Sequence, residues 1–391
     1  MNKKISLGVS LSITAIAIAI TCIFTMTFSQ NLFNSKVNVK ERTELNEIDN
    51  YVRANFIGEI NEEALKSAIS NGYINGLDDK YAHYYSAEEF QEEKLSDAGL
   101  LVGLGFTVIK DEGGYIRLVK VEENSPASEA GFKKDDLIVA VSGEDVLSKG
   151  YSQSLASLKG EEGSLVNITI RREGVDSEYQ LVRRKMEIVS VTGRVIDNIG
   201  YIKIETFNTK TAEQFKVLID DFTAQGVKGF VFDLRDNGGG ILDACEEMLN
   251  YLLPAGDVAT ATYKDGSQKV IVKTDGVHEV KLPVSVIVNK NTASASELFA
   301  VALRDAQKAV LVGTNTYGKG VMQYTTELSD GSAIKITVAT IETTKTPNYD
   351  GVGVKPNFEV TLTQAEEENF AQLDEKTDPQ LKKAIEVIGA D

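Results

Sequence analysis

Two residues of this sequence, Ser294 and Lys319, have the types and spacing that covalent acyl chemistry requires. Ser294 lies at the beginning of an apolar, helix-like run, and Lys319 follows it along the chain between two glycines. A serine hydroxyl becomes a strong nucleophile when a nearby base removes its proton, and a neutral lysine amine is one such base. The chain has two histidines, His83 and His278, and neither lies near this stretch. The pattern therefore predicts a serine nucleophile with lysine as its general base.

The position of Ser294 has a structural explanation as well as a catalytic one. Ser294 and Glu297 form a Ser-x-x-Glu capping box, which begins a helix and needs no chemistry. The same position favours catalysis, because the N–H groups and the positive dipole end of a helix stabilise negative charge on an attacked carbonyl oxygen. For the serine taken alone, helix capping is the favoured interpretation, and the catalytic one depends on Lys319.

Lys319 also has an ordinary alternative, because most lysines are solvated surface side chains. To act as a base, its amine must be neutral near physiological pH. That requires a pKa about three units below the usual value of roughly 10.4, a shift that costs about 4–5 kcal/mol. An apolar strand precedes Lys319 and glycines flank it, so close packing and burial are expected to supply this shift.

Other hydrolase and nucleotide-binding patterns are missing from the sequence. It contains no Gly-x-Ser-x-Gly elbow and no His-Glu-x-x-His pair. The run Gly238 to Gly240 lies between a predicted strand and helix, but no Gly-Lys-Ser/Thr ending follows it. We therefore expect no metal, no nucleotide and no other cofactor. The N–H groups of the glycine run are instead available for an oxyanion site.

The part of the chain around these residues has the pattern of an α/β fold, because buried strands and apolar helices alternate along it. The expected strands are 229–234, 282–288 and 309–312, and the expected helices are 242–252, the run that begins at Ser294, and 381–388 at the C-terminal end. A hairpin is expected to turn at Asp330-Gly331.

A separate segment, from about residue 99 to 186, has strand and turn signals and a glycine-containing run. In that run, Gly103, Leu104, Gly105 and Phe106, the two glycines let backbone N–H groups converge on one point, which makes an anion-binding nest. The strand beginning at Phe106 can pair with an added peptide strand while the nest binds the terminal carboxylate. The segment resembles a PDZ domain, a module that binds free protein C-termini.

The N-terminal end indicates a membrane segment followed by a helical module. The segment Ile5 to Phe28 has no charged residue, follows two lysines, and is long enough to span roughly 30 Å of hydrocarbon as a helix. We expect a retained single-pass anchor with the rest of the chain outside the cytoplasm; a cleaved signal peptide and secretion are the alternative. From residue 31 to 97, apolar residues recur at three- and four-residue intervals, which predicts a helical packing module without chemistry.

The net charge and the cysteine positions argue against a nucleic-acid partner and against a disulfide. The net charge of −17 argues against nucleic acid as a partner, because nucleic-acid binding needs a basic face. The two cysteines, Cys22 and Cys245, are placed in the anchor and the core, so no disulfide is expected.

Together these features resemble the C-terminal processing peptidases, also called tail-specific proteases. The resemblance rests on the order of anchor, PDZ segment and three runs, Asp233 to Gly240, Thr292 to Glu297 and Tyr317 to Gln323. It implies a crotonase-like (superhelical) α/β protease core with an inserted PDZ domain, a helical N-terminal module and an N-terminal membrane anchor. The expected boundaries are 1–30 for the anchor or signal segment, 31–97 for the helical module, 98–187 for the PDZ domain, 188–362 for the protease core and 363–391 for a helical tail.

The same resemblance implies roles for individual residues. Ser294 corresponds to the nucleophile and Lys319 to the general base, and Gln323 is implied to orient the lysine. The N–H groups of Ala295 and Gly239 are implied to form the oxyanion hole. Asp305 matches a supporting acidic position, for which a plain surface aspartate is the alternative. A homodimer supported by the helical ends is implied as well.

Two positions depart from the family pattern. The family commonly has proline where this chain has Gly238, and Pro-Asp where it has Pro356-Asn357. The first change loosens the glycine loop, and the second lies away from the nucleophile. Because neither change removes a catalytic group, activity is expected.

The sequence therefore predicts an extracytoplasmic serine endopeptidase that recognises proteins or peptides with apolar C-termini through its PDZ domain. The main alternative is a non-catalytic PDZ scaffold that binds protein tails, which would need neither Ser294 nor Lys319. A crotonase-like acyl-thioester enzyme is disfavoured, because a PDZ domain would then have no purpose.

Overall fold

The structure, a computed structural model, describes residues 39–389, and the chain divides after Ile69 into two units. Within the described residues, no helix is both long and apolar enough to span a bilayer. The segment expected to do so, Ile5 to Phe28, lies outside the residues that the structure describes.

The first unit consists of helix α2 (Val39–Asn55) and the beginning of α3 (Glu62–Asn75). Arg53 joins the two helices, because its guanidinium contacts Asp49 at 2.8 Å and Glu62 at 2.5 Å. These ion pairs are exposed and contribute little stability. Apolar side chains of α2, including Ile48, remain exposed in this unit.

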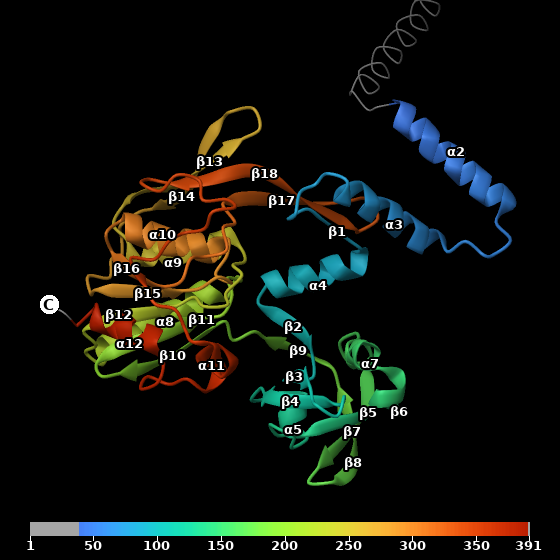
Figure 1. The fold of residues 1–391 in the computed structure, drawn as a ribbon, viewed down its shortest axis with the longest axis horizontal. Helices are drawn as coiled ribbons and strands as arrows, with labels where there is room; N and C mark the ends of the chain where they lie inside the picture. The colour runs from blue at the N-terminus through green and yellow to red at the C-terminus, as the bar shows by residue number, and fades with distance from the viewer. Residues whose placement is uncertain (1–38, 390–391) are drawn as a thin grey trace, which may run out of the picture. The chain divides into compact units, whose positions relative to one another are not determined.

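The second unit contains a six-stranded sheet in the order β10-β11-β12-β15-β16-β19, in which only the β10–β11 pair is antiparallel (Figure 1). Its strands are β10 (Val191–Ile196), β11 (Ile199–Ile204), β12 (Gly229–Asp233), β15 (Val284–Val288), β16 (Ala309–Gly313) and β19 (Phe358–Glu359). Every residue of β12 and β15 is buried, as expected for parallel strands covered on both faces. Successive residues of β12 alternate between two cores, with Phe230 and Phe232 in one and Val231 in the other.

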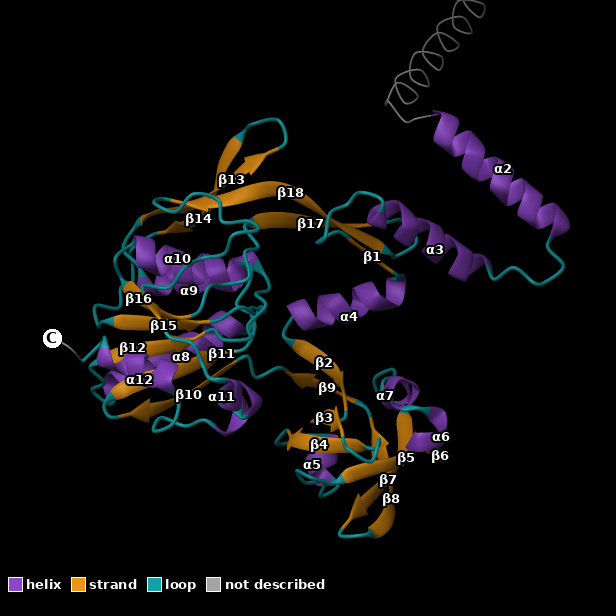
Figure 2. Ribbon diagram, in the orientation of Figure 1, coloured by secondary structure: helices purple, strands orange, loops and turns teal. Residues whose placement is uncertain are grey.

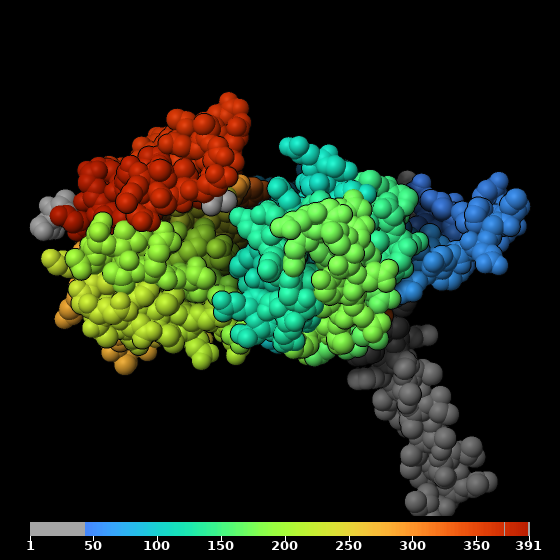
Figure 3. All heavy atoms as spheres, turned by 90° about the horizontal axis from the view of Figure 1, so that it is seen from below, coloured from blue at the N-terminus to red at the C-terminus, as the bar shows by residue number. Residues whose placement is uncertain are grey.

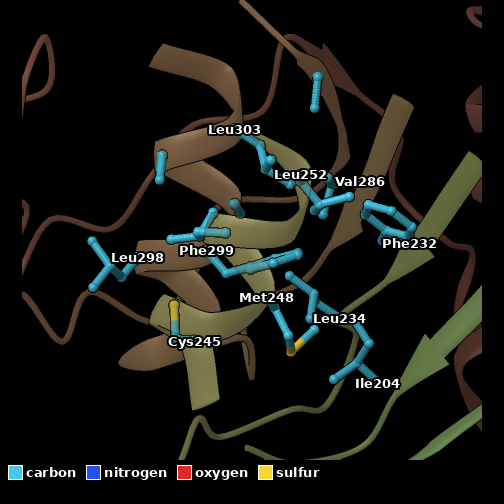
Figure 4. Packing of buried hydrophobic residues seen from close by; sticks show 14 of the residues in the cluster. Ile204, Phe232, Leu234, Cys245, Met248, Leu252, Val286, Leu298, Phe299 and Leu303 are labelled. Atoms are coloured by element: carbon cyan, nitrogen blue, oxygen red, sulfur yellow. The ribbon is translucent and has the colours of Figure 1, made fainter. Parts of the chain in front are cut away.

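Three helices, α8 (Thr211–Ala224), α9 (Leu242–Leu252) and α10 (Ala295–Asp305), belong to the larger of these two cores. Figure 4 shows Phe299 of α10 directed toward the sheet and Met248 of α9 beside Leu234, which follows β12. The ring centroids of Phe232 and Phe299 lie 6.0 Å apart. All the residues of α10 except Arg304 are buried, so packing fixes the position and direction of this helix.

A second sheet, β1-β18-β13-β14 with β17 also paired to β18, covers α9 and α10 from the other side (Figure 2). Its strands are β1 (His83–Tyr85), β13 (Gly256–Tyr263), β14 (Gln268–Thr274), β17 (Val321–Glu327) and β18 (Ala333–Thr343). The β17–β18 hairpin turns at Asp330-Gly331, as the sequence predicted. Strand β1 was not predicted: residues expected to form only helices supply a strand that pairs with β18.

The PDZ segment is a six-stranded antiparallel sheet in the order β3-β4-β5-β7-β8, with β6 paired to β5, and three short helices. Its elements are β3 (Phe106–Lys110), β4 (Ile116–Val121), α5 (Pro126–Glu129), β5 (Leu137–Val141), β6 (Glu144–Asp145), α6 (Val146–Lys149), α7 (Tyr151–Leu158), β7 (Leu165–Arg172) and β8 (Val175–Val182). Before and after it, β2 (Leu100–Gly103) pairs with β9 (Arg184–Glu187), and α4 (Ala87–Asp97) precedes β2.

The C-terminal residues form α11 (Gln364–Glu368), the 3₁₀ turn η1 (Phe370–Gln372) and α12 (Pro379–Glu386). Figure 3 shows this segment, in red, on the outside of the core. Leu381 and Ala384 of α12 pack on the sheet face that carries Val231, opposite α9 and α10. The helix predicted for 381–388 is thus present, beginning two residues earlier at Pro379.

Candidate active site

A cavity of about 420 Å³ lies where the α10 N-terminus, the glycine loop after β12 and the β17–β18 hairpin meet. Ser294, Lys319 and Gln323 all line it, although they come from separate parts of the chain. Its apolar lining includes Leu242, Leu298, Met322 and Ile341, and its polar lining includes Glu93, Asp97 and Lys335. The structure thus brings the three predicted catalytic side chains to one cavity.

Ser294 occupies a strained backbone conformation at the mouth of α10. Its φ of 58° and ψ of −122° are those of the first central residue of a type II′ turn, a position that normally needs glycine. The turn is closed by the Ser296 N–H, which donates to the Ala293 carbonyl at 3.2 Å. A non-glycine residue in such a conformation costs about 1–3 kcal/mol and is found most often at functional sites. Helix capping alone does not require this strain.

The two predicted oxyanion donors differ in their surroundings. Ala295 begins α10 and lines the cavity, and its N–H has no hydrogen-bond partner within residues 39–389. The Gly239 N–H donates instead to Asn237 Oδ1 at 2.9 Å, and Gly239 does not line the cavity, whereas Gly238 and Gly240 do. The assignment of Gly239 as a donor therefore stays a prediction, with a competing partner already in place.

Gly239 nevertheless fixes how closely the glycine loop approaches the serine. Its φ is +101°, and a Cβ atom built on it would lie 2.8 Å from Ser294 Cβ and 3.0 Å from the Ala295 nitrogen. At Gly238, a Cβ atom would meet nothing within 4 Å. The backbone at 239 thus touches the turn that carries Ser294, and only glycine permits this contact.

Lys319 is half-buried, and burial is the main reason that its pKa lies below the ordinary value. The nearby charge of Lys335 lowers this pKa further, while Asp79, Glu297 and Asp350 oppose the shift. The direction is the one that a lysine base requires. The structure contains no hydrogen bond between Lys319 Nζ and Ser294 Oγ, two residues that it describes; such contacts often tighten only in a substrate complex.

A fully buried carboxylate, Glu297, connects the serine turn with the lysine loop. Its Oε2 accepts the Ser294 N–H at 2.9 Å and the Lys319 N–H at 2.8 Å, and its Oε1 accepts the Gly318 N–H at 2.7 Å and the Thr316 hydroxyl at 2.5 Å. Four donors from two loops converge on one side chain. The sequence suggested Glu297 only as a helix-capping residue and missed this second loop.

Gln323 lies on β17 beside a register shift between Met322 and Gln323. Its amide nitrogen donates to Thr337 Oγ1 of β18 at 3.4 Å, a long and therefore weak contact. Thr337 in turn donates to Asp79 at 3.1 Å. No hydrogen bond joins Gln323 to Lys319 in the described structure, so its role in orienting the lysine stays a prediction.

Asp305, the candidate supporting residue, is buried but does not line the cavity. Its carboxylate accepts the Thr346 N–H at 2.9 Å and the Thr346 hydroxyl at 2.8 Å, and it also contacts the Thr343 hydroxyl. It therefore anchors the loop after β18 to the C-terminal end of α10, and it is not a surface aspartate.

A buried ion network holds the other end of the glycine loop. Arg235 contacts Asp233 at 2.5 Å and Asp378, the N-cap of α12, at 2.7 Å. Burial alone would raise the pKa of Asp233, but Arg235 and Lys203 lower it to about 2. The C-terminal helix is thus tied to the residues that lead into the glycine loop, a connection that local sequence patterns do not contain.

The predicted peptide-binding residues occupy the open edge of the PDZ sheet. Strand β3, which begins at Phe106, pairs only with β4 in the described sheet. The N–H groups of Leu104 and Gly105 have no hydrogen-bond partner within residues 39–389. Gly105 has a φ of +82°, and a Cβ atom there would lie 2.1 Å from Ser125 Cβ. The run Gly103 to Phe106 is thus open to a bound carboxylate, and its role in binding a peptide C-terminus stays a prediction.

Within residues 39–389, no group of His, Cys, Asp and Glu side chains has the arrangement of a metal site. Cys245 is buried, and burial raises the pKa of its thiol, so it remains a packing residue in the core.

Comparison with known proteins agrees with this division of the chain. The family model of Peptidase family S41 matches residues 198–360, and that of the PDZ domain matches residues 102–182. A CtpA-like serine protease of Staphylococcus haemolyticus is 31% identical over 364 residues, which are 90% of this chain and 72% of that protein. The carboxy-terminal processing protease CtpA of Bacillus subtilis is 29% identical over 367 residues, which are 93% of this chain and 78% of that protein.

One solved structure, a candidate S41 protease from Bacteroides fragilis, shares the fold. It covers 82% of this chain and 90% of its own, with a TM-score of 0.55 and 18% sequence identity.

Proposed function

This chain belongs to peptidase family S41, the C-terminal processing serine proteases, and on that premise we propose that Ser294 is its nucleophile and Lys319 its general base. The PDZ domain and the serine peptidase activity follow from family membership.

The observation that carries the proposal is the shared cavity. A strained serine at a helix N-terminus and a half-buried lysine with a lowered pKa line it together. Burial disfavours the ammonium form of Lys319, which is the direction that a proton-accepting amine requires. The strain at Ser294 holds its side chain at the helix mouth, where backbone N–H groups and the helix dipole favour an oxyanion.

The reaction then proceeds as follows. Neutral Lys319 Nζ takes the proton of Ser294 Oγ, which bonds to the scissile carbonyl carbon and forms a tetrahedral intermediate. The C–N bond breaks as Lys319 returns the proton to the departing amine, which leaves an ester on Ser294. Water, deprotonated by Lys319, attacks the ester carbonyl carbon. The bond to Ser294 Oγ then breaks, the new carboxylic acid leaves, and Lys319 returns the proton to Ser294 Oγ.

The Ala295 N–H is the first oxyanion donor, because Ala295 lines the cavity and its N–H has no partner in the described structure. The second comes from the glycine loop. Gly239, the donor implied by the resemblance, acts here only by sharing or exchanging its bond to Asn237. Gln323 orients Lys319 during the reaction, and its place in the cavity supports this role.

The substrate is a protein or peptide with an apolar C-terminus. The open edge of β3 and the free N–H groups of Leu104 and Gly105 support capture of such a tail. The apolar lining of the cavity, including Leu298 and Met322, supports an apolar side chain beside the scissile bond.

Location, assembly and fold class complete the proposal. The uncharged segment Ile5 to Phe28 supports a retained anchor, with the peptidase outside the cytoplasm and a cleaved signal as the alternative. We further propose a homodimer and a crotonase-like core. Carbonate extraction of membranes from cells that express the full chain tests the anchor: it predicts retention in the pellet, and release into the supernatant would contradict it.

Cleavage of an unfolded reporter protein with an apolar C-terminus tests the chemistry. Ser294→Ala and Lys319→Ala should each abolish cleavage, while Lys308→Ala, at a half-buried lysine outside the cavity, should not. Mass spectrometry identifies the cut sites and thermal melting confirms folding. If Ser294→Ala still cleaves and loses only about 1 kcal/mol of stability, helix capping is its only role.

A further inference from the structure

Residues 79–85, here called the strap, connect α3 to α4 and run along the outer part of the β17–β18 hairpin. Their C-terminal half is β1, whose residues His83 and Tyr85 pair with Lys335 and Ala333 of β18. The sequence assigned this segment to a packing module without chemistry. The structure instead brings it against the loop that carries Lys319.

Asp79 fixes the beginning of the strap. Its carboxylate accepts the Thr337 N–H at 3.0 Å, the Thr337 hydroxyl at 3.1 Å and the Tyr81 N–H at 3.0 Å. Burial alone would raise the pKa of Asp79, but these hydrogen bonds lower it, so the carboxylate stays ionised. Since Thr337 is also the partner of Gln323, the strap and the cavity share one residue of β18.

Tyr81 contacts the lysine directly. Lys319 Nζ lies 4.9 Å from the centre of the Tyr81 ring, over its face. The Tyr81 hydroxyl donates to the Gly318 carbonyl at 3.3 Å and contacts Asp350 at 3.5 Å. Tyr81 does not line the cavity that holds Ser294, so its ring covers the amine without blocking that cavity.

We propose that Tyr81 is a positioning residue of the peptidase: its ring forms a wall against the Lys319 amine and keeps water from it. The inference rests on the proposed role of Lys319 as general base. The strap is then part of the catalytic apparatus, and the reaction requires Tyr81 although this side chain takes no chemical part in it.

The charges around Lys319 show why this wall matters. The ammonium of Lys80 also lies over the Tyr81 ring, 4.6 Å from its centre. Asp79 from the strap, Glu297 from α10 and Asp350 from the loop after β18 all favour the ammonium form of Lys319, whereas Lys335 of β18 opposes them. Charge alone would therefore keep the amine protonated. Exclusion of water is the effect that outweighs the carboxylates, and Tyr81 supplies an aromatic surface for it.

The Tyr81 ring also has an opposing effect, because its face favours the ammonium form of Lys319. The face of an aromatic ring attracts an ammonium by about 0.5–1 kcal/mol at partly exposed sites, whereas burial shifts lysine pKa values by up to several units. The covering effect should therefore dominate. A leucine at this position separates the two effects, because it covers the amine without offering a π face.

The test is the pH dependence of kcat/KM for reporter cleavage by the full chain and by the variants Tyr81→Phe, Tyr81→Leu and Tyr81→Ala. Tyr324→Ala, at an exposed tyrosine of β17, is the matched control. Tyr81→Ala should move the acidic limb of kcat/KM to higher pH by about one unit, because water reaches the amine. At pH values below the limb, kcat/KM should therefore fall about tenfold. Tyr81→Phe should leave the limb in place, because the ring is kept and only the hydroxyl contacts with Gly318, Asp350 and Lys80 are lost.

In Tyr81→Leu the acidic limb should lie at the wild-type pH or lower. In Tyr324→Ala it should lie at the wild-type pH. A Tyr81→Ala profile that falls in height without moving along the pH axis would show a merely structural role and overturn the inference. So would a leucine variant shifted as far as alanine. Failure of the proposed function looks different: Lys319→Ala would then cleave as well as the wild type.

Discussion

The backbone N–H of Lys319 and that of Ser294 donate to the same carboxylate oxygen, Oε2 of Glu297, at 2.8 and 2.9 Å. One buried oxygen atom thus holds both the loop that carries the predicted base and the turn that carries the predicted nucleophile. A second hydrogen bond joins the same two segments, because the Tyr317 N–H donates to the Thr292 carbonyl at 3.0 Å, but Glu297 is the side chain that contacts both Ser294 and Lys319.

Glu297→Gln should disrupt this junction. The amide offers one acceptor oxygen where the carboxylate offers two, so at least two of the four buried donors lose their partner. Each unsatisfied donor costs about 1–3 kcal/mol, and we expect the free energy of unfolding to fall by about 2–5 kcal/mol. Urea denaturation measures this, with the exposed Glu213→Gln on α8 as control. Equal stability of variant and wild type would show that the junction is not required.

The charge of Lys335 should affect cleavage through the pKa of Lys319. A base acts in its neutral form, so activity rises with pH through the lysine pKa, and a neighbouring positive charge lowers that pKa. Lys335→Met should raise the pKa of Lys319 and move the acidic limb of kcat/KM upward by about 0.5 pH units, or roughly threefold in rate.

Lys335→Arg retains the charge and should retain the limb, which separates electrostatics from packing. Lys308→Met is the control, because this half-buried lysine donates to Leu282 away from the cavity. An unchanged limb in Lys335→Met would mean that burial alone sets the pKa of the base.

The contact between Gly239 and the serine turn predicts an asymmetry between neighbouring glycines. Gly239→Ala places a methyl group 2.8 Å from Ser294 Cβ at a φ unsuited to alanine, so the glycine loop must move away from the turn. We expect kcat to fall by about 10²–10³-fold, the usual cost of a lost oxyanion donor. Gly238→Ala, which meets open space, should remain within a few-fold of wild type. Comparable activity in the two variants would contradict the close approach.

The sequence predicted most of the strands and helices around the cavity because their signals are local. The buried run 229–234, the helix after Ser294 and the turn at Asp330-Gly331 all appear where periodicity and turn residues placed them. The junctions between distant segments were not predictable in this way. Glu297 accepts from residues some twenty positions away, and the Asp79–Thr337 bond joins opposite ends of the chain.

The helical prediction for residues 31–97 was incomplete for a related reason. Three residues, His83 to Tyr85, form a strand because they pair with the open edge of β18. The local sequence around them does not indicate that this edge is available. The interpretation of this module as free of chemistry missed Tyr81, which contacts Lys319. The segment expected to be a membrane anchor lies outside the described residues, and it stays a prediction.

The buried network at Arg235 predicts acid sensitivity. Because the pKa of Asp233 is depressed to about 2 in the folded state, its carboxylate contributes stability above its unfolded pKa of about 3.9, and this is lost as the pH falls toward 2. The difference in unfolding free energy between wild type and Asp233→Asn should therefore shrink between about pH 6 and pH 2.5. Urea titrations at the two pH values measure it. A constant difference would show that the charge of Asp233 is not what stabilises the loop.

The protonation state of Lys319 tests the central claim most directly. Full-length Ser294→Ala protein with ¹³C-labelled lysine, in which the Lys319 signal is assigned by its loss in Ser294→Ala/Lys319→Arg, allows its Cε shift to be followed with pH. The account predicts that this amine loses its proton well below the ordinary lysine value of about 10.4, ahead of the exposed lysines. An amine that stays fully protonated through about pH 9 would contradict the claim that Lys319 is the base.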